Sequence, residues 1–106
     1  MNIPDGYRFL LIDNSLVKLF RSYDGGFAIA EQWALNSGCT EIVPVEYNCY
    51  RVHGYSGSMY TIRNEQGSLN SYTRMMYDRI LRNSTDSVPI KEISLQEAID
   101  ILEENK

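Results

Sequence analysis

The sequence has no excess of positive charge and no long apolar run. Its 106 residues carry 10 Lys and Arg against 14 Asp and Glu, so the formal net charge is -4. A protein that binds a polyanion through its overall charge is usually basic, and this chain is acidic. A transmembrane helix needs roughly 18 consecutive apolar residues, whereas Phe9–Ile12 is as long as any apolar run here. We therefore expect no membrane partner.

Side chains that ligate metals or act as nucleophiles are also scarce. His53 is the single histidine, and two cysteines, Cys39 and Cys49, are too few for a disulfide framework, so we expect reduced thiols. The chain has no C-x-x-C or H-x-x-x-H spacing of the kind that binds metals. Cys49 and His53 share one strand face, but about 13 Å separates them along the strand, which is beyond a hydrogen bond. The sequence predicts no catalytic residues, no metal and no cofactor; an enzyme assembled around His53 by the fold is the least favoured hypothesis.

The beginning of the chain shows no export signal. Met1–Asp5 has neither a positively charged segment nor an apolar one, so a cytoplasmic location is expected. Hydrophobic residues are 43% and charged residues 23% of the chain, as in ordinary folded proteins. Residues 1–106 are expected to form a single compact domain.

The first third of the chain is typical of a β-hairpin followed by a helix. Tyr7–Asp13 is apolar at both alternate sets of positions, which predicts a central strand covered on both faces. Leu16–Tyr23 follows after a polar turn and should pair with it in antiparallel fashion. Helical spacing of apolar residues predicts a helix over Phe27–Ser37 that ends at Gly38. Trp33 is expected to anchor that helix on the hairpin.

The remainder of the chain mixes strands and helices. We expect strands over Thr40–Glu46, Asn48–Tyr55, Met59–Arg63 and Val88–Ile93, and a helix over Leu69–Arg82 that buries Leu69, Tyr72, Met76 and Ile80. Pro44 places the first of these strands at an edge or a bulge. Ser94 and Glu97 form a capping box that begins the last helix. The order ββα-βββ-α-β-α predicts an α+β fold, with a mixed or mainly antiparallel sheet of five to six strands and three helices mainly on one face.

Charge and tyrosine are distributed unevenly. Residues 1–50 have a net charge of -3, residues 51–82 carry five arginines against two acids for a net charge of +3, and residues 83–106 have a net charge of -4. Six of the eight tyrosines fall between Tyr47 and Tyr77. The middle of an acidic chain is therefore basic and rich in tyrosine.

This middle segment supplies the candidate binding residues. Arg51, His53 and Tyr55 share one strand face by period-two alternation. The full set of partner- or ligand-binding candidates is Arg51, His53, Tyr55, Tyr60, Arg63, Arg74 and Arg82. Tyrosine and arginine are enriched at protein-binding hot spots, and they also stack on bases and hold phosphates. An ordinary sheet and helix surface would show the same composition.

These observations favour one functional class and leave a second open. The first is a small non-catalytic binding protein that acts by protein–protein contact, such as an inhibitor or adaptor of the kind that phages and mobile elements encode. Its partner would be another protein or a second copy of the chain. The alternative is nucleotide or RNA binding through the Arg/Tyr-rich segment 50–82.

Overall fold

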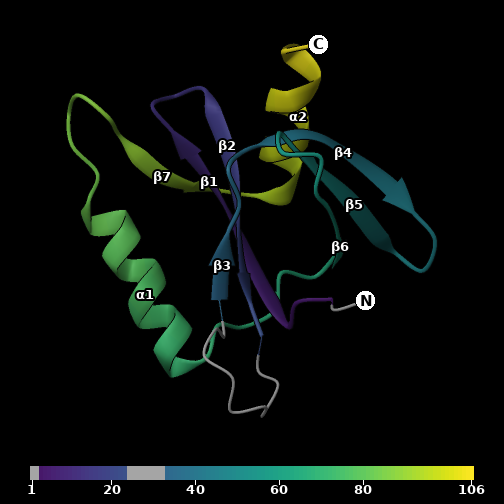
Figure 1. Ribbon diagram of the computed structural model, residues 1–106, viewed down its shortest axis with the longest axis horizontal. Coiled ribbons are helices and arrows are strands. Elements are labelled where there is room, and N and C mark those ends of the chain that lie inside the picture. The colour runs from purple at the N-terminus through teal and green to yellow at the C-terminus, as the bar shows by residue number, and fades with distance from the viewer. Residues whose placement is uncertain (1–2, 24–32) are drawn as a thin grey trace.

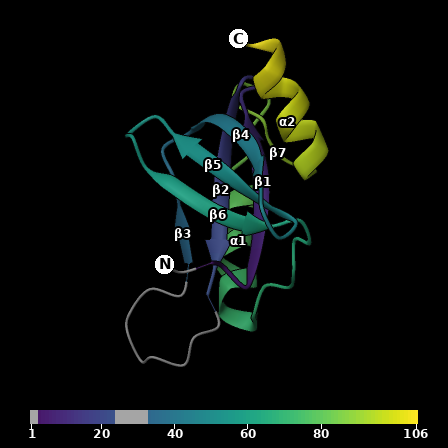
Figure 2. The ribbon, with the colours of Figure 1, turned by 90° about the vertical axis from the view of Figure 1, so that its right-hand side faces the viewer.

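Two antiparallel sheets and two helices make up the regular structure of residues 3–23 and 33–106, the part of the chain that the computed structural model describes (Figure 1). The elements are β1 (Gly6–Ile12), β2 (Leu16–Ser22), β3 (Trp33–Leu35), β4 (Cys39–Val45), β5 (Cys49–Gly54), β6 (Met59–Arg63), α1 (Ser71–Arg82), β7 (Ile90–Ile93) and α2 (Leu95–Glu104). Sheet A has the order β3-β2-β1-β7, and sheet B has the order β4-β5-β6. Helix α1 lies on one side of sheet A, and sheet B with α2 lies on the other (Figures 1 and 2).

The β1–β2 hairpin forms as the sequence predicts. The strands pair in register from Gly6 opposite Ser22 to Ile12 opposite Leu16. The turn between them places Asp13 and Asn14 at positive φ, a conformation that these two residue types tolerate well. Both faces of β1 are buried, as expected: one face contributes to the core against sheet B and α2, and the other contributes to the core against α1.

The helix predicted over residues 27–37 is wrong in its final part. Trp33–Leu35 is a strand, β3, that pairs with Phe20–Ser22 of β2, while residues 24–32 lie outside the described part of the chain. The Trp33 ring stacks on the Phe20 ring with centroids 5.5 Å apart, so Trp33 does pack on the hairpin, but from a strand and not from the expected helix. Backbone pairing offered by β2 overrides the helical spacing of the apolar residues.

The prediction of one sheet of five to six strands with three helices is also wrong. The described residues contain seven strands, divided into sheets of four and three, and two helices, which lie on opposite sides of sheet A. The two sheets face each other across a shared apolar core that includes Phe9 and Leu19 from sheet A and Val52 and Ile62 from sheet B. Alternation along a strand shows which side chains point inward, but it does not show which strands share hydrogen bonds.

Sheet B is a meander whose edge strand contains the proline. Pro44 lies in β4 opposite Tyr50 and is exposed, and β4 forms one edge of the sheet, as expected. The irregularity in β4 occurs between Cys39 and Glu41 rather than at Pro44. A proline is tolerated there because an edge strand leaves one side of its backbone unpaired.

Helix α1 begins two residues later than the sequence predicts, and it turns a different face toward sheet A. The Asn70 side chain caps it by accepting a hydrogen bond from the Thr73 backbone N–H at 2.9 Å. Thr73 and Tyr77 are its buried residues, whereas Tyr72, which was expected on the buried face, is 45% exposed. Tyr77 packs on Phe20 with ring centroids 5.1 Å apart, which fixes the face that α1 turns toward sheet A.

The C-terminal part of the chain adds an edge strand to sheet A and a helix to the core. Strand β7 pairs antiparallel with β1, opposite Phe9–Ile12. The capping box of α2 is confirmed, because the Ser94 hydroxyl accepts from the Glu97 N–H while the Glu97 carboxylate accepts from the Ser94 N–H. Hydrogen bonding of the Glu97 carboxylate by the Ser94 backbone N–H, and by the Ser94 hydroxyl, lowers the pKa of Glu97. Neither helix of the described residues is long and apolar enough to cross a membrane.

The loop after β6 is fastened to the beginning of β1. The Tyr7 backbone N–H donates to the Gln66 carbonyl at 2.8 Å, and the Arg8 guanidinium donates to the Gly67 carbonyl at 3.0 Å. Gly67 has a φ of +67°, and a Cβ there would overlap the Asp5 carbonyl oxygen. This close backbone approach couples sheet B to the central strand of sheet A.

Gly67→Ala should therefore destabilise the fold more than the same change at Gly57. Gly57 also has a positive φ, +84°, but has open space where a Cβ would lie. We expect Gly57→Ala to cost about 1 kcal/mol from backbone conformation alone, and Gly67→Ala to cost about 1–3 kcal/mol more. Urea denaturation of the two variants measures the difference. Equal losses would show that the approach to Asp5 does not constrain the loop.

Tyr7 should make the fold sensitive to alkali. Its buried hydroxyl donates to the Arg63 carbonyl at 2.6 Å, and burial raises its pKa from 10.0 to about 12. Because the Tyr7 pKa is higher in the folded than in the unfolded protein, the protonated phenol stabilises the folded state fully below about pH 10. This contribution is lost as the pH rises through about 12. Denaturation midpoints should therefore fall across this range, and less steeply in Tyr7→Phe. Tyr72→Phe, at a partly exposed position, is the control and should keep the wild-type slope.

Candidate functional site

Sheet B exposes one face to solvent. Val52 and Ile62 point into the core and are fully buried, so their neighbours on each strand point outward. We call this surface the outer face of sheet B; its central residues are Val43, Val45, Cys49, Arg51, His53, Thr61 and Arg63. Cross-strand pairing places Arg51 between Val43 on β4 and Thr61 on β6. Arg51 therefore lies in the middle of this face.

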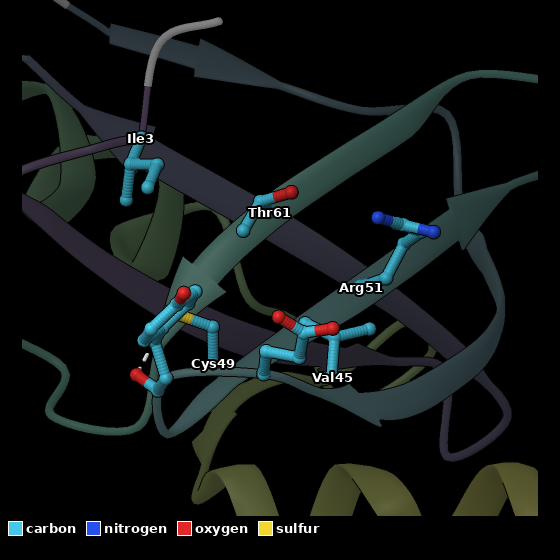
Figure 3. A pocket seen from close by; sticks show the side chains of 7 residues that line it. Ile3, Val45, Cys49, Arg51 and Thr61 are labelled. Carbon is cyan, nitrogen blue, oxygen red and sulfur yellow. Dashed lines mark hydrogen bonds between the residues drawn. The ribbon is translucent and has the colours of Figure 1, made fainter.

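An open pocket of about 600 Å³ occupies the end of the outer face nearest the β4–β5 turn (Figure 3). It is lined by Ile3, Val45, Glu46, Tyr47, Cys49, Arg51 and Thr61. The Cys49 thiol donates to the Tyr47 carbonyl at 3.4 Å and so fastens the turn to the adjoining strand. The volume falls within the range of ligand sites, and the lining combines aliphatic and aromatic groups with one cation, Arg51, and one carboxylate, Glu46.

The seven candidate residues do not form one surface. Arg51, His53 and Arg63 lie on the outer face of sheet B. Tyr55 follows β5 in the next turn, where its ring lies against the backbone of Gly38. Tyr60 pairs with Val52 and points inward, where the Arg21 guanidinium lies 3.9 Å from its ring centroid. Arg74 and Arg82 belong to α1, on the opposite side of sheet A.

The two arginines of the outer face differ in how they are held. Arg63 donates from its guanidinium to the Pro4 carbonyl at 3.2 Å. Arg51 is half-buried, and its side chain makes no hydrogen bond or ion pair with any residue in the described ranges. By contrast, Arg74 on α1 pairs with Asp78 at 3.7 Å. Within the described part of the chain, Arg51 thus presents an unpaired cation in the pocket lining.

Tyr47 is a functional candidate that the sequence-based selection missed. It lies at the tip of the β4–β5 turn, is 91% exposed and has a φ of +61°. The β1–β2 turn has the same pair of positive φ values but is built from Asp13 and Asn14, residue types that adopt them readily. The signal was present in the sequence, because the strands expected over 40–46 and 48–55 leave Tyr47 alone between them.

The two cysteines occupy different environments. Both are free thiols, as expected, and lie at opposite ends of sheet B, where Cys39 pairs with Gly54 and Cys49 with Val45. Cys39 is buried, and burial raises its pKa from 9.0 to about 11. The Cys49 thiol lines the pocket. Within the described ranges no group of His, Cys, Asp and Glu is arranged to hold a metal ion, and no hydrogen bond links the His53 imidazole to a hydroxyl or thiol.

No protein-family model, curated protein or solved structure matches this chain. Function is therefore inferred from the outer face of sheet B, its pocket and the adjoining turn.

The thiols should differ in reactivity. At about pH 8 a disulfide reagent such as 5,5′-dithiobis(2-nitrobenzoate) should modify Cys49 rapidly, because its thiol borders solvent, and should spare Cys39 until the protein unfolds. Absorbance of the released thiolate measures both phases. Cys49→Ser should remove the fast phase, and two fast phases in the wild type would contradict the burial of Cys39.

Proposed function

We propose that this protein is a small non-catalytic binding module that contacts a partner protein through the β4–β5 turn and the adjoining outer face of sheet B. The observation that carries this proposal is Tyr47, a large aromatic side chain held in solvent on a left-handed backbone. Aromatic residues dominate the energetics of protein interfaces because each one buries a large apolar area at low cost in side-chain entropy.

Folding alone does not account for a tyrosine at position 47. A bulky residue with positive φ costs about 1 kcal/mol or more relative to glycine or asparagine, and a side chain that is 91% exposed recovers little of this by packing. Asp13 occupies the corresponding position of the β1–β2 turn without such a conflict. Backbone strain of this kind concentrates at functional sites, which supports a contact made by the Tyr47 ring.

The surface beside Tyr47 suits a protein partner. Val45 and Ile3 supply aliphatic area, and Arg51 supplies one unpaired cation. A central apolar patch with an arginine and a tyrosine has the composition of an interface hot spot. An inhibitor or adaptor of the type encoded by phages and mobile elements would act through such a patch. We also propose a cytoplasmic location, where a reducing environment keeps both cysteines as thiols.

Nucleotide or RNA binding through segment 50–82 is less well supported. The arginines of that segment divide between the outer face of sheet B and α1, with sheet A between them. A ligand that contacted both sets would have to extend around the molecule. A homodimer formed through the Tyr47 turn fits the proposal, since the partner is then a second copy.

Tyr47→Asn should stabilise the protein and abolish its association. Asparagine tolerates positive φ, so the free energy of unfolding should rise by about 0.5–1 kcal/mol, while loss of the ring removes the main interface anchor. Denaturant unfolding measures the first effect. Affinity capture of the tagged protein from its host, followed by mass spectrometry, measures the second, with size-exclusion chromatography to detect self-association.

Tyr72→Asn is the matched control, because Tyr72 is 45% exposed on α1, away from sheet B. It should keep every partner that the wild type captures. The proposal is wrong if Tyr47→Asn retains those partners, or if Tyr72→Asn loses them instead.

A further inference from the structure

We infer that the pocket beside Arg51 binds a protein segment that presents a carboxylate, from an Asp or Glu side chain or from a chain terminus. This inference rests on the proposed function and specifies the chemistry of the partner. Its basis is one pocket in which a half-buried guanidinium, unpaired within the described ranges, meets an aliphatic wall and an exposed aromatic side chain.

Arg51 is prepared for a charged ligand. Its neighbours across the sheet, Val43 and Thr61, flank its stem, and its position in the central strand restricts where the guanidinium can reach. A guanidinium matches a carboxylate through two parallel hydrogen bonds, and such charge-assisted pairs are roughly twice as strong as neutral ones. No residue of the described ranges pairs with the Arg51 guanidinium, whereas Arg63 donates to the Pro4 carbonyl and Arg74 pairs with the Asp78 carboxylate.

The aliphatic wall of the pocket indicates which kind of side chain should lie next to the carboxylate in the partner segment. Val45 and Ile3 offer aliphatic surface (Figure 3). The exposed Tyr47 side chain also lines the pocket. An apolar side chain of the partner next to the acidic one would cover Val45 and Ile3 while the carboxylate reaches Arg51. A volume of about 600 Å³ has room for two such side chains together.

The acidic groups around the pocket argue against a polyanion. Glu46 lines the pocket itself. Helix α2 packs along β4, where Lys106 bridges Glu41 at 3.0 Å and Glu103 at 3.3 Å, so this lysine offers sheet B no unpaired positive charge. A phosphate backbone crossing this face would bring several negative charges toward Glu46, whereas the charge of a single carboxylate is offset by Arg51 in the same pocket.

A charge-swap selection tests the inference. A phage-displayed library of random peptides, about 12 residues long so that each peptide exceeds the span of the pocket, is selected separately on the wild type and on Arg51→Glu. The wild type should enrich an Asp or Glu adjacent to an aliphatic residue. Arg51→Glu should enrich Lys or Arg at the same place. A synthetic peptide from the wild-type selection should bind Arg51→Gln about tenfold or more weakly, as expected for loss of a charge-assisted hydrogen bond.

Arg82→Gln and Arg82→Glu are the matched controls, because Arg82 is an exposed arginine on α1. They should leave the peptide affinity and the selected motif unchanged. Circular dichroism melts verify that every variant is folded. Absence of any peptide that depends on Arg51, or selection of the same acidic peptides by Arg51→Glu, overturns the inference. So does binding of a uridine decanucleotide at about 150 mM salt that Arg51→Gln abolishes.

The two proposals fail separately. If Tyr47→Asn loses its captured partners while the Arg51 charge swap leaves the selected motif unchanged, the Tyr47 turn is still the interface, but Arg51 does not bind a carboxylate of the partner. If Tyr47→Asn keeps its partners, the turn is not the interface, whatever the peptides show.

Discussion

Burial of the β1–β2 hairpin on both faces is the constraint on which the rest of the structure depends. Phe9 and Leu19 point to one side of sheet A, Leu10 and Phe20 point to the other, and all four are fully buried. Removing one such side chain from water contributes about 1.5–3 kcal/mol. The chain must therefore supply two separate covers. Helix α1 is one of them, and sheet B together with α2 is the other. Among residues 3–23 and 33–106, this leaves the outer face of sheet B as the broad sheet surface that faces solvent.

Local signals in the sequence predict the elements that depend on local interactions. The first hairpin, the strand over residues 59–63 and the capping box at Ser94 form as expected, because turn residues, alternation and side-chain caps act within a few residues. The division into two sheets, the strand at Trp33–Leu35 and the orientation of α1 do not follow from local pattern. Each is decided by a partner distant in sequence, such as Phe20 for both Trp33 and Tyr77.

The same distinction explains the candidate site. Alternation correctly groups Arg51 with His53, because both lie on one strand. Alternation within a strand does not show where that strand lies relative to α1. Arg74 and Arg82 were therefore expected beside Arg51, although sheet A lies between α1 and sheet B. Tyr60 pairs with Val52, and its alternation with Ile62 could have shown that it faces inward. Tyr47 does not stand out from the composition, because the number of tyrosines carries no information on the backbone conformation at each one.

The pairing of β1 with β7 has a consequence for synthesis on the ribosome. Strand β1 is synthesised well before its pairing partner Ile90–Ile93 and before α2, because five strands and α1 lie between them in the sequence. Until then the hairpin presents an unpaired backbone edge along Phe9–Ile12 and lacks part of its apolar cover. Such nascent edges invite non-native strand pairing. The short polar connection over residues 83–89 brings β7 to that edge directly after α1, which limits the time that the edge stays open.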